Sequence, residues 1–134
     1  MKTMYDKSRH ARYKLVYHLV VATEYRRKCL TPEMINRMRE ISELITSRHE
    51  CKVIEFGGES DHVHLLFEAP PKIRLTEFIN VFKSGTSRRI RKEYKSHLDQ
   101  FYMKDKLWTN SYLIISSGGA PIEIIKKYIQ EQDN

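Results

Sequence analysis

The pattern of apolar and polar positions predicts four β-strands separated by helices. The predicted strands are residues 13–22, 51–56, 62–67 and 112–116. The first of them is apolar on both faces and rich in β-branched and aromatic residues, which is typical of a central strand. Gly57-Gly58 lies between the second and third strands, so these two are expected to pair as a hairpin around that glycine turn.

Apolar residues at helical spacing predict three helices. They are residues 31–48, residues 75–98 and about residues 121–133. The first begins with Thr31-Pro32, a typical N-cap followed by proline in the first turn, and the last follows a tether at residues 117–120. The order β-α-β-β-α-β plus a final helix predicts a ferredoxin-like α+β fold, an antiparallel sheet with two helices on one face.

Two histidines lie two residues apart in the third predicted strand. Successive side chains on a strand point to opposite faces, so His62 and His64 share one face. The other face carries Val63, Leu65 and Phe67 and is expected to point into the core under the helices. Two neighbouring imidazoles can bind one divalent metal ion. On the strand pattern alone, a pair of exposed or hydrogen-bonded histidines is the alternative.

The final predicted helix carries a second candidate group. Ile122, Ile125 and Ile129 form an apolar stripe along it. At about 100° per residue, Tyr128 and Gln132 lie together beside that stripe. A helix docked by its isoleucines would hold a tyrosine hydroxyl and an amide oxygen at the border of the buried surface. An ordinary tyrosine at an amphipathic boundary is the alternative.

Basic residues are in excess, with 24 Lys and Arg against 17 Asp and Glu and a net charge of +7. This balance suggests a polyanionic partner. Candidates for phosphate contacts gather after the first strand and in the long helix, where two serines could add hydroxyl contacts. They are Arg26, Arg27, Lys83, Ser84, Ser87, Arg88, Arg89, Arg91 and Lys92. For any single one of them, a position on a solvated surface is the alternative.

Length and composition limit the class of protein. At 134 residues, the chain is expected to form one domain over residues 1–134. The polar N-terminus and the lack of an apolar run near ~18 residues predict neither a signal peptide nor a membrane span. Cys29 and Cys51 lack the spacing of a zinc site and are expected to be reduced thiols. A cytoplasmic protein is expected, associated with the nucleoid when it binds DNA.

The histidine pair and the Tyr-x-x-x-Gln helix resemble the small single-tyrosine transposases of bacterial and archaeal insertion sequences. These are members of the His-hydrophobic-His endonuclease superfamily. The resemblance covers nearly the whole chain, in four stretches. They are residues 17–27, 61–66, 83–91 and 107–132. The two motifs are specific in combination, and together they favour the metal-site interpretation of the histidines.

This resemblance implies a transposase that cleaves and rejoins single-stranded DNA at insertion-sequence ends and recognises DNA hairpins there. Tyr128 would be the catalytic nucleophile and would become linked to a 5′-phosphate. His62, His64 and Gln132 would bind Mg²⁺ or Mn²⁺ at the scissile phosphate. A non-catalytic or domesticated ferredoxin-like nucleic-acid-binding protein is the alternative. A barrel hydrolase that uses a His-x-His pair would need ~200 residues or more, which excludes that class.

The resemblance also implies a homodimer whose subunits exchange their final helices across the face of the sheet opposite the other two helices. Tyr128 of one chain would then act with the histidine pair of the other. Gly118 and Gly119 would be the hinge, because two successive glycines let the helix swing. On the residues alone, a turn that needs positive φ explains these glycines equally well.

Overall fold

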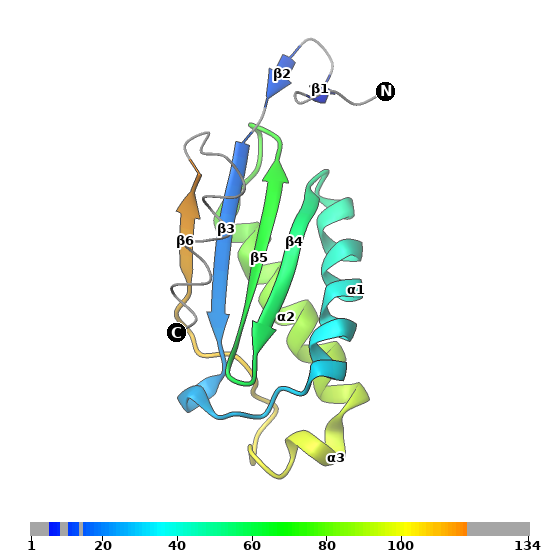
Figure 1. The fold of residues 1–134 in the computed structure, drawn as a ribbon, viewed down its shortest axis with the longest axis vertical. Coiled ribbons are helices and arrows are strands. Elements are labelled where there is room, and N and C mark those ends of the chain that lie inside the picture. The colour runs from blue at the N-terminus through cyan, green and yellow to red at the C-terminus, as the bar shows by residue number, and fades with distance from the viewer. Residues whose placement is uncertain (1–5, 9–10, 14, 118–134) are drawn as a thin grey trace.

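The computed structural model describes residues 6–8, 11–13 and 15–117 (Figure 1). Both histidines and all the predicted DNA-contacting residues lie within these ranges. The predicted final helix, its hinge at Gly118 and Gly119, and the site residues Tyr128 and Gln132 lie outside the described residues.

A four-stranded antiparallel sheet forms the centre of the fold. Its strands are β3 (Leu15–Ala22), β4 (Lys52–Glu59), β5 (His62–Ala69) and β6 (Leu113–Ser116). They lie in the order β4-β5-β3-β6 (Figure 1), so β3 is a central strand, as its apolar faces predict. Two further strands, β1 (Asp6–Ser8) and β2 (Ala11–Tyr13), form a separate antiparallel pair. The sequence pattern does not predict them, because three residues are too few to show a period.

Two long helices cover one face of this sheet. They are α1 (Pro32–Arg48) and α2 (Leu75–Glu93) (Figure 1). α1 begins where the sequence predicts, because Thr31 Oγ1 accepts a hydrogen bond from the backbone N–H of Met34 at 3.2 Å. With strands and helices in the order β-α-β-β-α-β, the predicted ferredoxin-like α+β fold is confirmed.

The second predicted helix is shorter than the expected residues 75–98. α2 ends at Glu93 because Tyr94 leaves the helical conformation, with φ −120° and ψ 37°, and the short helix α3 (Lys95–Leu98) follows. The change of direction at Tyr94 buries Leu98 and Tyr102 in the core, at 0% and 4% exposure. Tertiary burial therefore overrides the helical pattern at this point.

The core lies between the sheet and the two helices. Val63, Leu65 and Phe67 of β5 are fully buried there, as predicted, and the Phe67 ring lies 4.8 Å from the ring of Phe78 on α2. Burial of each such side chain contributes about 1.5–3 kcal/mol. A shift of β5 by one residue would expose all three, so this burial fixes the register of the strand. The same register directs His62 and His64 to the face away from the helices.

The glycine pair does not form the hairpin turn, and that prediction is wrong. β4 runs through Gly57 and Gly58, and the turn between β4 and β5 is formed by Ser60 and Asp61. A Cβ added at Gly58 would lie 2.4 Å from the carbonyl oxygen of His62, and one at Gly57 would lie 3.2 Å from His64 Cε1. The two glycines therefore allow a close approach of β4 to the histidine strand.

Candidate functional site

The two histidines lie next to each other on the sheet face opposite the helices. His62 pairs with Ala22 of β3 and with Glu59 of β4, and His64 pairs with Val20 and Gly57. His62 is buried, with 5% of the residue's surface exposed. The sequence prediction that the two imidazoles share one face is confirmed by this register.

A third histidine borders the pair from the neighbouring strand. His18 of β3 is 3% exposed, and its ring lies 5.9 Å from the ring of His64 in an edge-on arrangement. The sequence gives no reason to place His18 at the site, because the neighbourhood depends on the pairing of β3 with β5. The His64 ring is therefore enclosed by His18 on one side and by the backbone of Gly57 on the other.

Asp61 fixes the orientation of His62. Its Oδ1 lies 2.8 Å from His62 Nδ1, and its Oδ2 accepts a hydrogen bond from Arg26 Nε at 3.2 Å. Partial burial raises the pKa of the Asp61 carboxyl, but the bonds to His62 and Arg26 lower it more, so its pKa falls below the usual value. An ionised carboxylate only accepts, so Nδ1 carries the ring proton that it receives, and in the neutral ring the lone pair then lies on Nε2. Metal-binding histidines typically have such a carboxylate partner.

The loop after β3 holds this carboxylate in place. Thr23 donates its backbone N–H to the carbonyl oxygen of Asp61 at 2.9 Å, and Leu30 donates to that of Ser60 at 2.9 Å. Within the loop, the 3₁₀ turn η1 (Glu24–Arg26) has positive φ at Tyr25 (60°) and Arg26 (54°). Left-handed backbone costs a non-glycine residue roughly 1–2 kcal/mol. The hydrogen bonds around the loop sustain this strain and direct Arg26 to Asp61.

Two carboxylates near His62 were not among the predicted site residues. Glu59, Asp61 and His62 offer ligand atoms that all lie within 4.8 Å of one another, and His64 is not one of the three. Imidazole nitrogen with carboxylate oxygen is a donor set that suits Mg²⁺, Mn²⁺ or Zn²⁺. The sequence signal is the pair of acidic residues flanking Ser60. This signal points to the site only once the turn is known to lie at Ser60-Asp61, because that turn brings both acidic residues next to His62.

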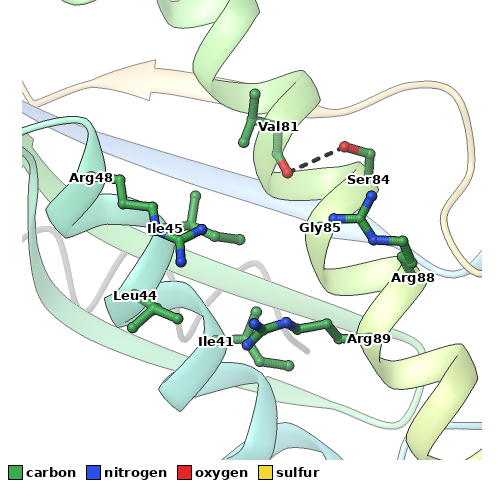
Figure 2. A pocket seen from close by; sticks show the side chains of 9 residues that line it. All are labelled: Ile41, Leu44, Ile45, Arg48, Val81, Ser84, Gly85, Arg88 and Arg89. Carbon is green, nitrogen blue, oxygen red and sulfur yellow. Dashed lines mark hydrogen bonds between the residues drawn. The ribbon is translucent and has the colours of Figure 1, made fainter.

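The predicted DNA-contacting residues separate into two groups. In the first, Arg88 and Arg89 of α2 are exposed and line a groove with Arg48 of α1. Figure 2 shows the guanidinium of Arg48 over Ile45 and Arg89 extending toward α1. Ser84 lines the same groove, Lys92 is exposed in the last turn of α2, and Ser87 is half-buried. The groove lies between the helices, so the sheet separates it from the histidines.

The cations of the second group bind other parts of the protein. Arg91 is 6% exposed and forms ion pairs with Asp99 and Asp105, so it is not the exposed cation that the sequence predicts. The break in helix at Tyr94 brings Asp99 within reach of it. Lys83 Nζ donates to the carbonyl oxygens of Thr109 and Asn110, at 2.8 and 3.1 Å.

The surroundings of Lys83, Arg27 and Arg26 differ. Desolvation, with the nearby charge of Lys106, lowers the pKa of Lys83 below its ordinary value. Arg27 donates from Nη1 to the carbonyl oxygen of Phe101, and its guanidinium lies over the ring of Tyr102 at 5.2 Å. Arg27 therefore ties the loop after β3 to the chain beyond α3. Arg26 is the one residue of the predicted DNA set that contacts the histidine site, through Asp61.

Comparison with known proteins defines the class. Residues 11–132 match the family described as IS200-like transposases, and the chain belongs to this family. It is 30% identical to the ISDra2 transposase TnpA of Deinococcus radiodurans over 94% of this chain and 89% of that protein. It is 26% identical to the transposase for insertion sequence element IS200 of Salmonella typhimurium, over 92% of this chain and 80% of that protein.

Solved structures agree with this assignment. A Deinococcus radiodurans R1 crystal structure described as a transposase superposes with a TM-score of 0.75 at 30% identity, covering 95% of this chain and 97% of that one. The structure of a REP-associated tyrosine transposase bound to a REP hairpin has a TM-score of 0.60 at 10% identity, over 91% and 68% of the two chains. The second likeness concerns the fold. Among the described residues, no helix is long and apolar enough to cross a membrane.

Proposed function

We propose that this transposase cleaves and rejoins single-stranded DNA at the ends of an insertion sequence, through a covalent link between Tyr128 and a 5′-phosphate. The observation that carries the proposal is the arrangement of His62, held by Asp61, beside His64 on one face of the sheet, in a chain of the IS200-like family. Tyr128 and Gln132 enter it from the sequence resemblance alone.

The site residues have distinct roles in the proposed reaction. His62, His64 and Gln132 would hold a divalent cation, Mg²⁺ or Mn²⁺, and Asp61 would orient the His62 ring through Nδ1. Bound there, the cation would polarise the scissile phosphate and offset its developing charge. The Tyr128 hydroxyl, with an ordinary pKa of ~10, attacks the phosphorus. The bond to the 3′-oxygen breaks, and that oxygen leaves as a 3′-OH with the proton.

Rejoining reverses this step. The 3′-OH of another strand attacks the phosphotyrosine, the bond to Tyr128 breaks, and the tyrosine regains its proton. One phosphodiester is exchanged for another, so the reaction needs no ATP. A homodimer with exchanged final helices, which would pair Tyr128 of one subunit with His62 and His64 of the other, is part of the proposal.

Hairpin recognition is assigned to the α1–α2 groove, on the other side of the sheet from the histidines. Arg88, Arg89 and Ser84 would contact phosphates there, with Arg48 added to the predicted set. Lys92 and Ser87 extend this surface along α2. The REP-hairpin complex of a protein with this fold supports hairpin binding by such a domain. Lys83, Arg27 and Arg91 are assigned to the fold instead, because they already bind protein groups.

The proposed activity is tested with a labelled single strand that carries a hairpin next to an element end. We expect cleavage and a covalent protein–DNA product in Mg²⁺ or Mn²⁺, and neither product in EDTA or with a fully duplex version. Tight binding without cleavage in any divalent metal would instead favour the non-catalytic nucleic-acid-binding protein.

A second experiment tests the groove. The Arg88→Ala/Arg89→Ala double variant should bind the hairpin more weakly and lower the slope of log affinity against log salt by about one unit per lost phosphate contact. The matched control removes two exposed cations outside the groove, in Lys72→Ala/Arg74→Ala. Binding titrations at four or more salt concentrations give the slopes. Equal salt slopes for the two double variants would show that Arg88 and Arg89 are solvated surface residues that do not contact phosphates.

A further inference from the structure

An exposed aromatic ring lies at the edge of the histidine site. Tyr25 is 76% exposed, more than any other aromatic side chain in residues 15–117. It follows β3 in the turn η1, which Figure 1 shows in blue next to the turn between β4 and β5. Its neighbours in sequence, Arg26, Arg27 and Lys28, are also exposed. The surface around the ring is therefore cationic rather than apolar.

The protein holds Tyr25 in a conformation that a tyrosine rarely adopts. Its φ is 60° and ψ is 18°, and Arg26 follows with φ 54°. Because the ring is mostly exposed, its own packing offsets little of this strain. The strain is sustained by neighbouring bonds: Arg26 N–H to the Thr23 carbonyl at 2.9 Å, and Tyr102 Oη–H to the Glu24 carbonyl at 2.8 Å. Strained, over-determined residues of this kind cluster at ligand-binding sites.

A cation fixes the orientation of the ring. The Arg27 guanidinium lies 5.1 Å from the centre of the Tyr25 ring and 5.2 Å from that of Tyr102, which is 4% exposed. Its Nη1 also donates to the Phe101 carbonyl oxygen. Anchored to the core at Tyr102, Arg27 supports the exposed ring from behind.

The position of the ring ties it to the site. Arg26, the next residue, donates to Asp61 at 3.2 Å, and Asp61 bonds His62 Nδ1 at 2.8 Å. A strand whose phosphate reaches the histidines thus passes a rigid aromatic surface flanked by cations. Aromatic rings with nearby cations bind single strands by stacking on the bases, with little dependence on sequence.

We propose that Tyr25 is a stacking platform for an unpaired base next to the phosphate that is cut, and thereby positions the strand at His62 and His64. The inference rests on the proposed function, and it assigns Tyr25 as a positioning residue. Arg26 and Lys28 contribute attraction for the phosphates on either side of that base. Bases inside a duplex would not satisfy the platform, because each of them already stacks on its neighbours on both faces.

The test uses single strands with 2-aminopurine at successive positions around the cleavage site. Binding is measured without divalent metal, so that no cleavage occurs. We expect wild type and Tyr25→Phe to quench one position strongly, because both offer an aromatic ring. Tyr25→Gly should lose that quenching and bind the strand at least about fivefold more weakly. Tyr112→Ala, which removes a tyrosine of 39% exposure directly before β6, serves as the control and should quench like wild type.

Glycine is the informative substitution because it suits positive φ. Tyr25→Gly should melt at a temperature equal to or above that of wild type, so a loss of quenching in this variant cannot result from misfolding. In the presence of metal, cleavage by Tyr25→Gly should show a raised KM and a kcat within a few-fold of wild type. Unchanged quenching in Tyr25→Gly would overturn the platform, whether or not cleavage occurs. Site-specific quenching by a wild-type protein that never cleaves would contradict the proposed function and leave the platform in place.

Discussion

Tyr128→Phe is expected to bind hairpin-bearing single strands like wild type and to lose cleavage by on the order of 10³-fold or more. The substitution removes one oxygen from a residue that the sequence pattern predicts at the border of an amphipathic helix, where phenylalanine also fits and a hydroxyl contributes little to stability. It removes the oxygen proposed to attack phosphorus, and phenylalanine cannot form the covalent intermediate in its place. Gel assays of cleavage and of hairpin affinity on the same preparations separate the two effects.

The identity of the attacking tyrosine is read directly from the adduct. With wild type, mass spectrometry of the covalent protein–DNA product should place the DNA on Tyr128. Tyr102 is a poor rival, because burial raises the pKa of its hydroxyl and that hydroxyl donates to the Glu24 carbonyl. Tyr25 is the stronger rival, since it is exposed and lies next to the residue that binds Asp61. An adduct on Tyr25, or full cleavage by Tyr128→Phe, would overturn the assignment.

The proposed exchange of final helices is tested by combining Tyr128→Phe with a second variant. If Tyr128 of one subunit acts with the histidines of the other, mixing Tyr128→Phe with His62→Ala protein should restore part of the activity. One of the two composite sites in a mixed dimer would then hold an intact histidine pair and an intact tyrosine. The mixed dimers are prepared by co-expressing the two variants with different tags, because slow exchange between purified dimers would otherwise limit the result.

The fold follows from the sequence to the extent that each pattern has one solution. The apolar faces of β3 and the alternation through Val63, Leu65 and Phe67 predict the central strands, and burial under α1 and α2 leaves no other register. The glycine pair misleads because glycine has two uses. At Gly57 and Gly58 it serves close approach of two strands rather than a turn.

The site is predicted in part, and the missing part is tertiary. His62 and His64 share a face by local geometry alone. Asp61 bonds the adjacent His62, but it also accepts a hydrogen bond from Arg26, 35 residues away in the sequence. No periodic pattern predicts a contact over that separation. The basic residues of α2 look like one cluster in sequence. Around a helix they separate, so that Arg88 and Arg89 face the groove while Arg91 turns inward to Asp99.

The second large effect is expected from removing either histidine of the proposed metal site. His62→Ala and His64→Ala should each abolish metal-dependent cleavage while hairpin affinity stays nearly unchanged, because affinity is assigned to the groove behind the sheet. Asp61→Asn should reduce metal affinity roughly 10–100-fold, since it weakens the bond that orients His62. Calorimetric titration with Mn²⁺ measures the affinity, and cleavage measures the consequence.

Glu59 distinguishes two possible ligand sets. If the ion is held by His62 and His64, Glu59→Gln should bind Mn²⁺ within a few-fold of wild type, whereas His64→Ala should lose it. If the ion is held by Glu59, Asp61 and His62, whose ligand atoms lie within 4.8 Å of one another, the order reverses. Gly57→Ala sharpens the comparison, because its Cβ would press on the His64 ring from 3.2 Å and leave Glu59 unchanged. Weakened Mn²⁺ binding in Gly57→Ala together with normal binding in Glu59→Gln would place the ion on the histidine pair, and the opposite result would move it to the acidic cluster.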